Sequence, residues 1–253
     1  MEQSITSYQV YTQRERRRSD LDWDAYMAQA WPEFINHDQI ADKYWPAYYE
    51  DLADFLFYLC EDDKVVAHGK TIPVRWEDGL STLPDMGWDW AIQSGVTGYA
   101  EGFQPNMLSA LEISIAPQFR GKGLSKVCLE LMYHIADQQG FDKLVAPVRP
   151  SQKHLYPLIS IEDYITWRRD DGLLFDGWLR THERMGAKIL HVAPQSMQVV
   201  GTVAEWEEWT GIAFPASGQH IVPLALNPMT IDREADQGIY IEPNVWLVHT
   251  VMV

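Results

Sequence analysis

Two hydrophobic runs separated by a charged turn stand out in the first third of the chain. Phe55–Cys60 (FLFYLC) is apolar throughout, which is typical of a buried strand. Glu61–Lys64 follows as a polar turn, and Val65–Val74 returns as a second, mostly apolar run. Two strand-like runs joined by so short a turn predict an antiparallel β-hairpin.

The hydrophobic period changes within Leu111–Gly140, from the alternation of a strand to the spacing of a helix. Ile113 and Ile115 alternate with polar or small residues, and Pro117 ends this alternation because proline donates no ladder hydrogen bond. After a short loop, apolar residues recur at helical spacing up to Gly140, namely Leu124, Val127, Cys128, Leu131, Met132 and Ile135. The stretch predicts a strand, a tight loop and an amphipathic helix.

The loop between that strand and that helix contains Gly121 and Gly123. Glycine has no Cβ to cover the backbone N–H groups, and the start of a helix carries a partial positive charge. Such a loop favours a phosphate or another anion. It lacks the third glycine of a dinucleotide-binding fingerprint, because Ser125-Lys126 stands where that glycine would fall, and it lacks the Gly-Lys-(Ser/Thr) of a Walker loop. An ordinary strand–turn–helix corner is the structural alternative.

The rest of the chain has a weaker pattern, with no repeat, low-complexity tract or clear linker. We therefore expect one domain over residues 1–253, with an N-terminal helical segment at about 1–54 and a C-terminal extension at about 194–253. Within it the pattern predicts a long, loop-rich segment with several glycines at Trp76–Asn106, in which Trp88–Ile92 could form a helical turn or more. It also predicts a helix at Asp176–Met185, a strand at Lys188–Ala193, mostly loop at Gly211–Gln237 and a final strand from Gly238.

Charge and composition narrow the classes of ligand. The chain carries a formal net charge of −16, which disfavours nucleic acid as a partner because the phosphates would be repelled. The glycine loop is nevertheless locally basic, with Arg120, Lys122 and Lys126. Local cations in an acidic protein fit a small molecule that bears phosphate, although solvated surface charges are an equally simple explanation.

Other features exclude several classes of site. The two cysteines, Cys60 and Cys128, are too few for a disulfide framework or a zinc site, and the histidines show no metal-ligand spacing, so we expect no metal. The first ten residues do not resemble a secretory signal, and no apolar run reaches the length of a membrane span. A cytoplasmic protein that contacts no membrane is the default expectation.

The spacing Gln118-x-x-Gly121-x-Gly123 resembles the acyl-CoA signature of the GNAT N-acetyltransferase superfamily, (Gln/Arg)-x-x-Gly-x-(Gly/Ala). The resemblance covers about Phe55–Ala193. It implies a mixed α/β fold of the α+β kind, with a mostly antiparallel sheet, one splayed parallel pair of strands and helices on both faces. It also implies that acetyl-CoA, or another acyl-CoA, binds as co-substrate at the loop and the preceding strand: Ile113, Ile115, Gln118, Phe119, Arg120, Gly121, Lys122, Gly123, Leu124 and Ser125.

The resemblance also suggests catalytic residues. Many members use a glutamate on the first splayed strand as a base, and Glu112 matches that element. Their usual thiolate acid is a tyrosine four residues before the glycine that ends the later helix. Counting back from Gly186 gives His182 here, a departure that leaves acid, base or orienting roles open. Transfer of an acetyl group to an amine of a small molecule is the leading expectation.

Two other functions stay open. The segment around Asp176–Ala187 is also similar to the GNAT-like domains of polyketide synthase loading modules, which process CoA and carrier-protein thioesters, including malonyl decarboxylation. His182 and Ser114 would then be the polar pair, and a carrier protein would be a partner. A non-catalytic acyl-CoA-binding module is the second alternative. The chain is expected to be a monomer or a homodimer, and its last strand, Ile239–Val253, is a candidate pairing edge.

Overall fold

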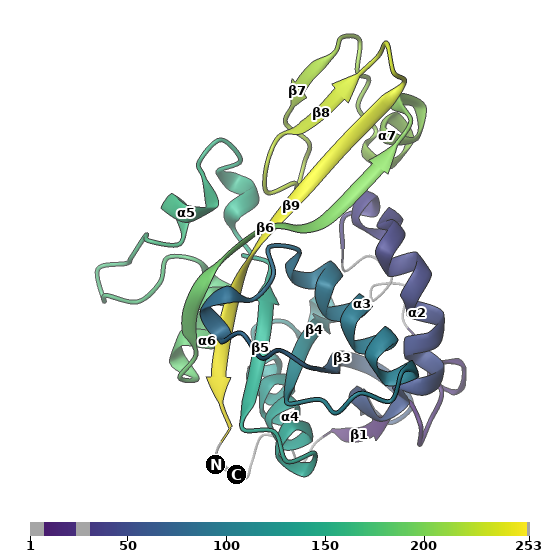
Figure 1. The fold of residues 1–253 in the computed structure, drawn as a ribbon, viewed down its shortest axis with the longest axis vertical. Helices are drawn as coiled ribbons and strands as arrows, with labels where there is room; N and C mark the ends of the chain where they lie inside the picture. The colour runs from purple at the N-terminus through teal and green to yellow at the C-terminus, as the bar shows by residue number, and fades with distance from the viewer. Residues whose placement is uncertain (1–7, 24–30, 252–253) are drawn as a thin grey trace.

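The computed structural model describes residues 8–23 and 31–251, and its centre is one sheet of nine strands (Figure 1). The strand order is β1-β2-β3-β4-β5-β9-β8-β7, and β6 also pairs with β9. Every pairing is antiparallel except that of β4 with β5. The strands are β1 (Gln9–Thr12), β2 (Leu56–Glu61), β3 (Lys64–Val74), β4 (Met107–Ile115), β5 (Lys143–Val148), β6 (Lys188–Gly201), β7 (Gly218–His220), β8 (Met229–Asp232) and β9 (Gln237–Thr250).

Helices cover both faces of this sheet and divide the core in two. Helices α2 and α3 pack on one face, and α4 and α6 pack on the other. The fold class expected from the sequence is confirmed. The α-helices are α2 (Gln39–Asp51), α3 (Gly87–Ala100), α4 (Leu124–Gln138), α5 (Ile161–Tyr164), α6 (Gly177–Arg184) and α7 (Val203–Thr210); short 3₁₀ helices are η1 (Arg18–Asp20), η2 (Glu33–His37), η3 (Ala53–Phe55), η4 (Leu80–Thr82), η5 (Pro117–Phe119) and η6 (Lys153–Leu155).

The parallel pair β4–β5 diverges along its length. Only Leu108–Leu144 and Ser109–Val145 are paired, although both strands continue for several residues. Opposite β3, the register places Lys70 beside Glu112 and Thr71 beside Ala110, so Leu111 is the extra residue of a β-bulge. The indole N–H of Trp88 donates a hydrogen bond to the carbonyl oxygen of Leu111 at 2.9 Å. The two strands thus form the open V that the resemblance implies.

The structure confirms the hairpin, now β2–β3, and the strand, loop and helix of β4 and α4. Two expectations were wrong. Trp76–Asn106 is not mainly loop, because the helical turn expected at Trp88–Ile92 belongs to the fourteen-residue α3. Gly95 and Gly98 disfavour a helix in the sequence, but a Cβ at Gly95 would lie 2.3 Å from Ile72, so the glycine permits close packing. The final strand, β9, is not a sheet edge, because β5 pairs with its last residues and β6 with most of its length.

The long strands β6 and β9 continue beyond the helices into an arm that also carries β7, β8 and α7 (Figure 1). Trp206 of α7 is fully buried there and donates its indole N–H to the Gly238 carbonyl at 2.9 Å. The segment Gly211–Gln237, expected to be mostly loop, contains the short strands β7 and β8. Helix α7 is preceded by a capping box of Thr202 and Glu205.

Candidate active site

The glycine loop leaves β4 and enters α4 with its backbone uncovered. Gly121 and Gly123 have φ of 75° and 81°, a region that favours glycine, and a Cβ at either would meet nothing within 4 Å. Within the described residues, no hydrogen bond uses the N–H groups of Gly121, Lys122 or Gly123. Phe119 is buried and anchors the loop to the α4 core. The loop offers several free donors at a helix N-terminus, which is an anion-binding arrangement.

The basic side chains of this loop are exposed, and each contacts a neighbouring residue of the loop or of α4. The Arg120 guanidinium donates to the Ile115 carbonyl at 3.3 Å, and the Lys122 ammonium lies 4.5 Å from the Phe119 ring centre. Lys126 pairs with Glu130, one turn along α4, at 3.4 Å. Surface contacts of this kind are weak, so these side chains can turn to a phosphate at little cost.

Glu112 is the centre of a buried polar cluster on the α2–α3 side of the V. Its Oε1 accepts hydrogen bonds from Trp31 Nε1 and His68 Nε2, both at 2.9 Å, and from Ser114 Oγ at 2.6 Å. Its Oε2 accepts from Lys70 Nζ at 2.6 Å. The Glu112 side chain is only 10% exposed, so these four donors replace its water.

Burial and charge act against each other in this cluster. Burial alone would raise the pKa of Glu112, but Lys70 and His68 together hold it well below the ordinary value of a carboxyl. Burial lowers the pKa of His68 to about 4 despite the nearby carboxylate, so its ring is neutral at pH 7. Burial would also lower the pKa of Lys70, yet Glu112 raises it above its usual value. Glu112 is therefore a stable anion that accepts a proton reluctantly.

His68 has a second ring nitrogen that is not used. When Nε2 donates to Glu112, Nδ1 is left as an acceptor, and it is buried without a partner among the described residues. The Trp23 ring stacks on His68 with a centroid distance of 5.1 Å, and the Lys70 ammonium lies 4.3 Å from the centre of the Trp45 ring. The cluster is a carboxylate–imidazole pair with a free lone pair, surrounded by indoles.

His182 lies on the other face of the sheet, away from Glu112 and Ser114. Asp176 caps the N-terminus of α6 by accepting from the backbone N–H groups of Trp178 and Leu179, and it also accepts from the Tyr164 hydroxyl at 2.9 Å. His182 Nδ1 is 2.8 Å from His249 Nε2, and His249 Nδ1 is 2.5 Å from the Tyr133 hydroxyl. The structure thus brings Glu112 and Ser114 together, and gives His182 different partners.

Five residues of these two clusters were not assigned a role from the sequence: Trp31, His68, Lys70, Tyr133 and His249. His68 and Lys70 lie two residues apart in an otherwise apolar strand, and this periodicity puts them on one face. That was the available signal. Tyr133 and His249 are far apart in sequence and meet only through the placement of β9 beside β5.

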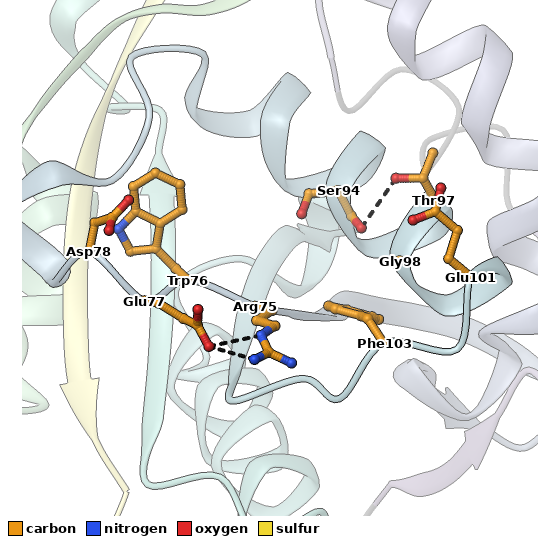
Figure 2. Close-up of a pocket in the computed structure, with 9 residues that line it drawn as sticks. All are labelled: Arg75, Trp76, Glu77, Asp78, Ser94, Thr97, Gly98, Glu101 and Phe103. Atoms are coloured by element: carbon orange, nitrogen blue, oxygen red, sulfur yellow. Dashed lines mark hydrogen bonds and ion pairs between the residues drawn. The ribbon is translucent and has the colours of Figure 1, made fainter.

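A shallow hollow of about 390 Å³ lies apart from the glycine loop and from both polar clusters (Figure 2). Its wall includes Trp76, the Arg75–Glu77 contact (3.1 and 2.5 Å) and Glu101 near the end of α3. It adjoins the start of β4, whereas the glycine loop follows the end of β4, so the nine-residue strand, roughly 30 Å long, separates them. Among the described residues, no cluster of histidine, cysteine, aspartate and glutamate could hold a metal ion, and no helix there is long and apolar enough to cross a bilayer.

Residues 20–160 match the Acetyltransferase (GNAT) family. The arginine N-acetyltransferase avaD of Aspergillus versicolor is 33% identical over 254 residues, which span 89% of this chain and 87% of that protein. This match extends well beyond the glycine loop and includes flanking segments that the sequence pattern alone supported only in general terms.

Solved structures share the fold. The loading GNATL domain of CurA from Lyngbya majuscula aligns with a TM-score of 0.60 at 18% identity, covering 96% of this chain and 98% of that one. The GphF GNAT-like decarboxylase, solved with isobutyryl-CoA, aligns with a TM-score of 0.53 at 15% identity, covering 90% and 92%. The described fold, the glycine loop, the family match and the curated relative agree: the chain belongs to the acetyltransferase (GNAT) family and is an acyltransferase.

Proposed function

We propose that this protein transfers an acyl group, most simply acetyl, from its CoA thioester to an amine of a small molecule. The observation that carries the proposal is the open Gly121–Gly123 loop at the start of α4, directly after the strand that diverges from β5. Free N–H groups and a helix dipole suit a pyrophosphate, and the V between the strands suits an extended arm. The backbone around Ile113–Ile115 would hold that arm.

The acceptor we propose is a cationic amino acid related to arginine. Support comes from the arginine N-acetyltransferase that is 33% identical over most of both chains. The net charge of −16 favours the approach of a cationic molecule. The aromatic side chains around Glu112, including Trp31 and Trp45, offer flat apolar surfaces against which a cation can pack.

The chemistry requires that the amine lose a proton and that the departing CoA thiolate gain one. The amine nitrogen forms a bond to the thioester carbon, the carbon–sulfur bond breaks, and the excess proton leaves the nitrogen. We propose that the Glu112–His68 pair receives this proton at the free Nδ1 of His68, with Glu112 orienting the ring and balancing its charge. Glu112 would thus act through His68, since the carboxylate is already saturated by four donors. His182 is the proposed thiolate acid.

Isothermal titration of the protein with acetyl-CoA, malonyl-CoA and CoA tests the first step. A thiol-release assay with arginine, ornithine, lysine or no acceptor tests the second. We expect acetyl-CoA to bind and thiol release to depend on a cationic amino acid. Consumption of malonyl-CoA without an amine would instead indicate a thioester-processing enzyme. Binding without any turnover would indicate a binding module, and absence of binding would refute the cofactor site.

A further inference from the structure

Three side chains, Tyr133 of α4, His249 of β9 and His182 of α6, form a continuous hydrogen-bonded chain on the side of the sheet that α4 and α6 cover. Tyr133 of α4 is 2.5 Å from His249 Nδ1, and His249 Nε2 is 2.8 Å from His182 Nδ1. His182 and His249 are each 1% exposed, whereas Tyr133 is only half-buried. The chain of contacts therefore runs from a partly solvated phenol to a buried imidazole.

The protonation of this chain follows from the environment of the rings. Burial lowers the pKa of His182 well below its ordinary value, with a further contribution from His249, and burial lowers the pKa of His249 to about 4. Both rings are then neutral at pH 7, and each carries one proton on one nitrogen. Since two neutral rings share a single hydrogen bond, the direction in which the first donor points fixes the direction of the whole chain.

Two directions are possible, and they differ in whether His182 Nε2 is a donor or an acceptor. If the Tyr133 hydroxyl donates to His249 Nδ1, His249 Nε2–H donates to His182 Nδ1, and His182 carries its proton on Nε2. If the hydroxyl donates instead to the Met185 carbonyl, the order reverses and His182 Nε2 becomes an acceptor. The 2.5 Å contact between the hydroxyl and His249 Nδ1 is present in both orders. Only the first order gives His182 an Nε2–H that can donate to a leaving sulfur, and it is the order adopted for the proposal.

The far end of the chain, His182 Nε2, is buried and has no partner among the described residues. Its neighbour is the Trp178 ring, whose centroid is 4.3 Å from that of His182 in an edge-on arrangement. A buried N–H without an acceptor is energetically unfavourable, and a bound ligand with an acceptor at this point would remove that penalty. The sulfur of an acyl-CoA is such an acceptor once it carries negative charge.

We propose that Tyr133 and His249 are positioning residues that fix the Nε2–H form of His182 and supply a proton to its Nδ1 while its Nε2 gives one up. The proposal rests on the proposed acyl transfer. When the carbon–sulfur bond breaks, the thiolate takes the proton from His182 Nε2 and an S–H bond forms. At the same time His249 Nε2 gives its proton to His182 Nδ1, and the Tyr133 hydroxyl gives its proton to His249 Nδ1. Neither ring keeps a charge, and the phenol oxygen is left as a phenolate. After the thiol departs, the proton that the amine released returns through water to His182 Nε2, and the shifts reverse: His182 Nδ1 gives its proton to His249 Nε2, and His249 Nδ1 gives its proton to the phenol oxygen, which restores the Nε2–H form.

Ring ¹⁵N spectra of His182 in the ligand-free protein test the positioning role without any turnover. The parent should show a protonated Nε2 and an unprotonated Nδ1. His249→Leu should abolish this preference. His249→Gln should keep it, because an amide N–H can still donate to Nδ1. Tyr133→Phe, which removes one hydroxyl from a half-buried ring, should weaken the preference. A parent spectrum with the proton on Nδ1, or a His249→Leu spectrum identical to that of the parent, would overturn the proposal.

Steady-state kinetics of acetyl transfer test the proton relay from Tyr133 through His249 to His182. Tyr133→Phe and His249→Gln should lower kcat for acetyl transfer about tenfold or more, while the KM for acetyl-CoA changes less than twofold. Tyr99→Phe and His134→Gln, both exposed on helices, are the matched controls and should leave kcat unchanged. Equal kcat in parent and both variants would overturn the relay. If the parent itself transfers no acyl group, the proposed function fails, and the spectra still decide the positioning role.

Discussion

Breaking the buried Lys70–Glu112 pair by removing one partner should lower the free energy of unfolding by several kcal/mol, because the other charge then stays buried without its partner. Each side chain is only 10% exposed, and the two charges are 2.6 Å apart. Lys70→Met would leave the Glu112 carboxylate buried with only the neutral donors Trp31, His68 and Ser114. Loss of one partner of a buried pair costs about 3–5 kcal/mol, and we expect a value in that range.

A double-mutant cycle with Glu112→Gln separates the pair from its surroundings. Each single variant leaves one buried charge without its partner, whereas the double variant leaves none. The double variant should therefore be more stable than the sum of the single losses predicts, by roughly 2–3 kcal/mol. Urea unfolding followed by tryptophan fluorescence measures all four proteins. The exposed Arg75–Glu77 pair is the control, since Arg75→Met should cost no more than about 1 kcal/mol.

The pH dependence has a definite sign. The pKa of Glu112 is lower in the folded protein than in the unfolded chain, so folding releases its proton. Its contribution is complete above the unfolded pKa of about 4.3 and declines as the pH falls below that value. Lys70→Met should shrink this acid-side loss of stability. A Lys70→Met variant that loses less than about 1 kcal/mol at pH 7, or an additive cycle, would refute the reasoning.

Three further changes test other parts of the molecule. Gly121→Glu puts a charged side chain at φ 75° in the anion loop and should weaken CoA binding at least about tenfold in calorimetry, whereas Gly102→Glu, at φ 71° beyond α3, should not. Burial and the charge of Asp38 raise the pKa of Asp89 to about 9, so folding takes up a proton, stability should fall as the pH rises toward 9, and Asp89→Asn should flatten the thermal midpoint against pH. Gly238→Ala places a Cβ 2.2 Å from Trp206 and should cost about 1–3 kcal/mol in urea unfolding, more than Gly177→Ala, where the nearest atom would lie 3.6 Å from the Cβ.

The sequence predicted those parts of the fold in which local pattern and burial agree. The hairpin β2–β3 and the unit from β4 to α4 have regular periods and clear boundaries, and the glycine loop lies between them. Of helix α3 only the turn at Trp88–Ile92 could be predicted, because the later glycines oppose helix propensity; Gly95 permits close packing on Ile72 instead. The strands that pair with β9 could not be predicted, because strand order depends on contacts between distant segments and the local hydrophobic pattern carries no information about them.

The candidate site follows the same division. The loop, whose chemistry is local, could be located from Gln118 to Gly123, whereas the partners of Glu112 and His182 could not. Glu112 meets His68 and Lys70 through the register of β3 with β4, and His182 meets His249 through the pairing of β9 with β5. A spacing rule identified the position of His182 but not the two side chains that determine which of its nitrogens carries the proton.

The placement of the two polar clusters on opposite faces of the sheet has a chemical consequence for the proposed reaction. Acyl transfer to an amine moves one proton away from the nucleophile and another onto the leaving sulfur, and a single group placed to do both would have to turn within one step. Here Glu112 and His68 lie on the α2–α3 side, and His182 with its relay lies on the α4–α6 side. The diverging strands β4 and β5 separate them, so a thioester held in that V would meet a proton acceptor from one side and a donor from the other. The two proton transfers then need no shared residue, and variants in one cluster should leave the protonation state of the other unchanged.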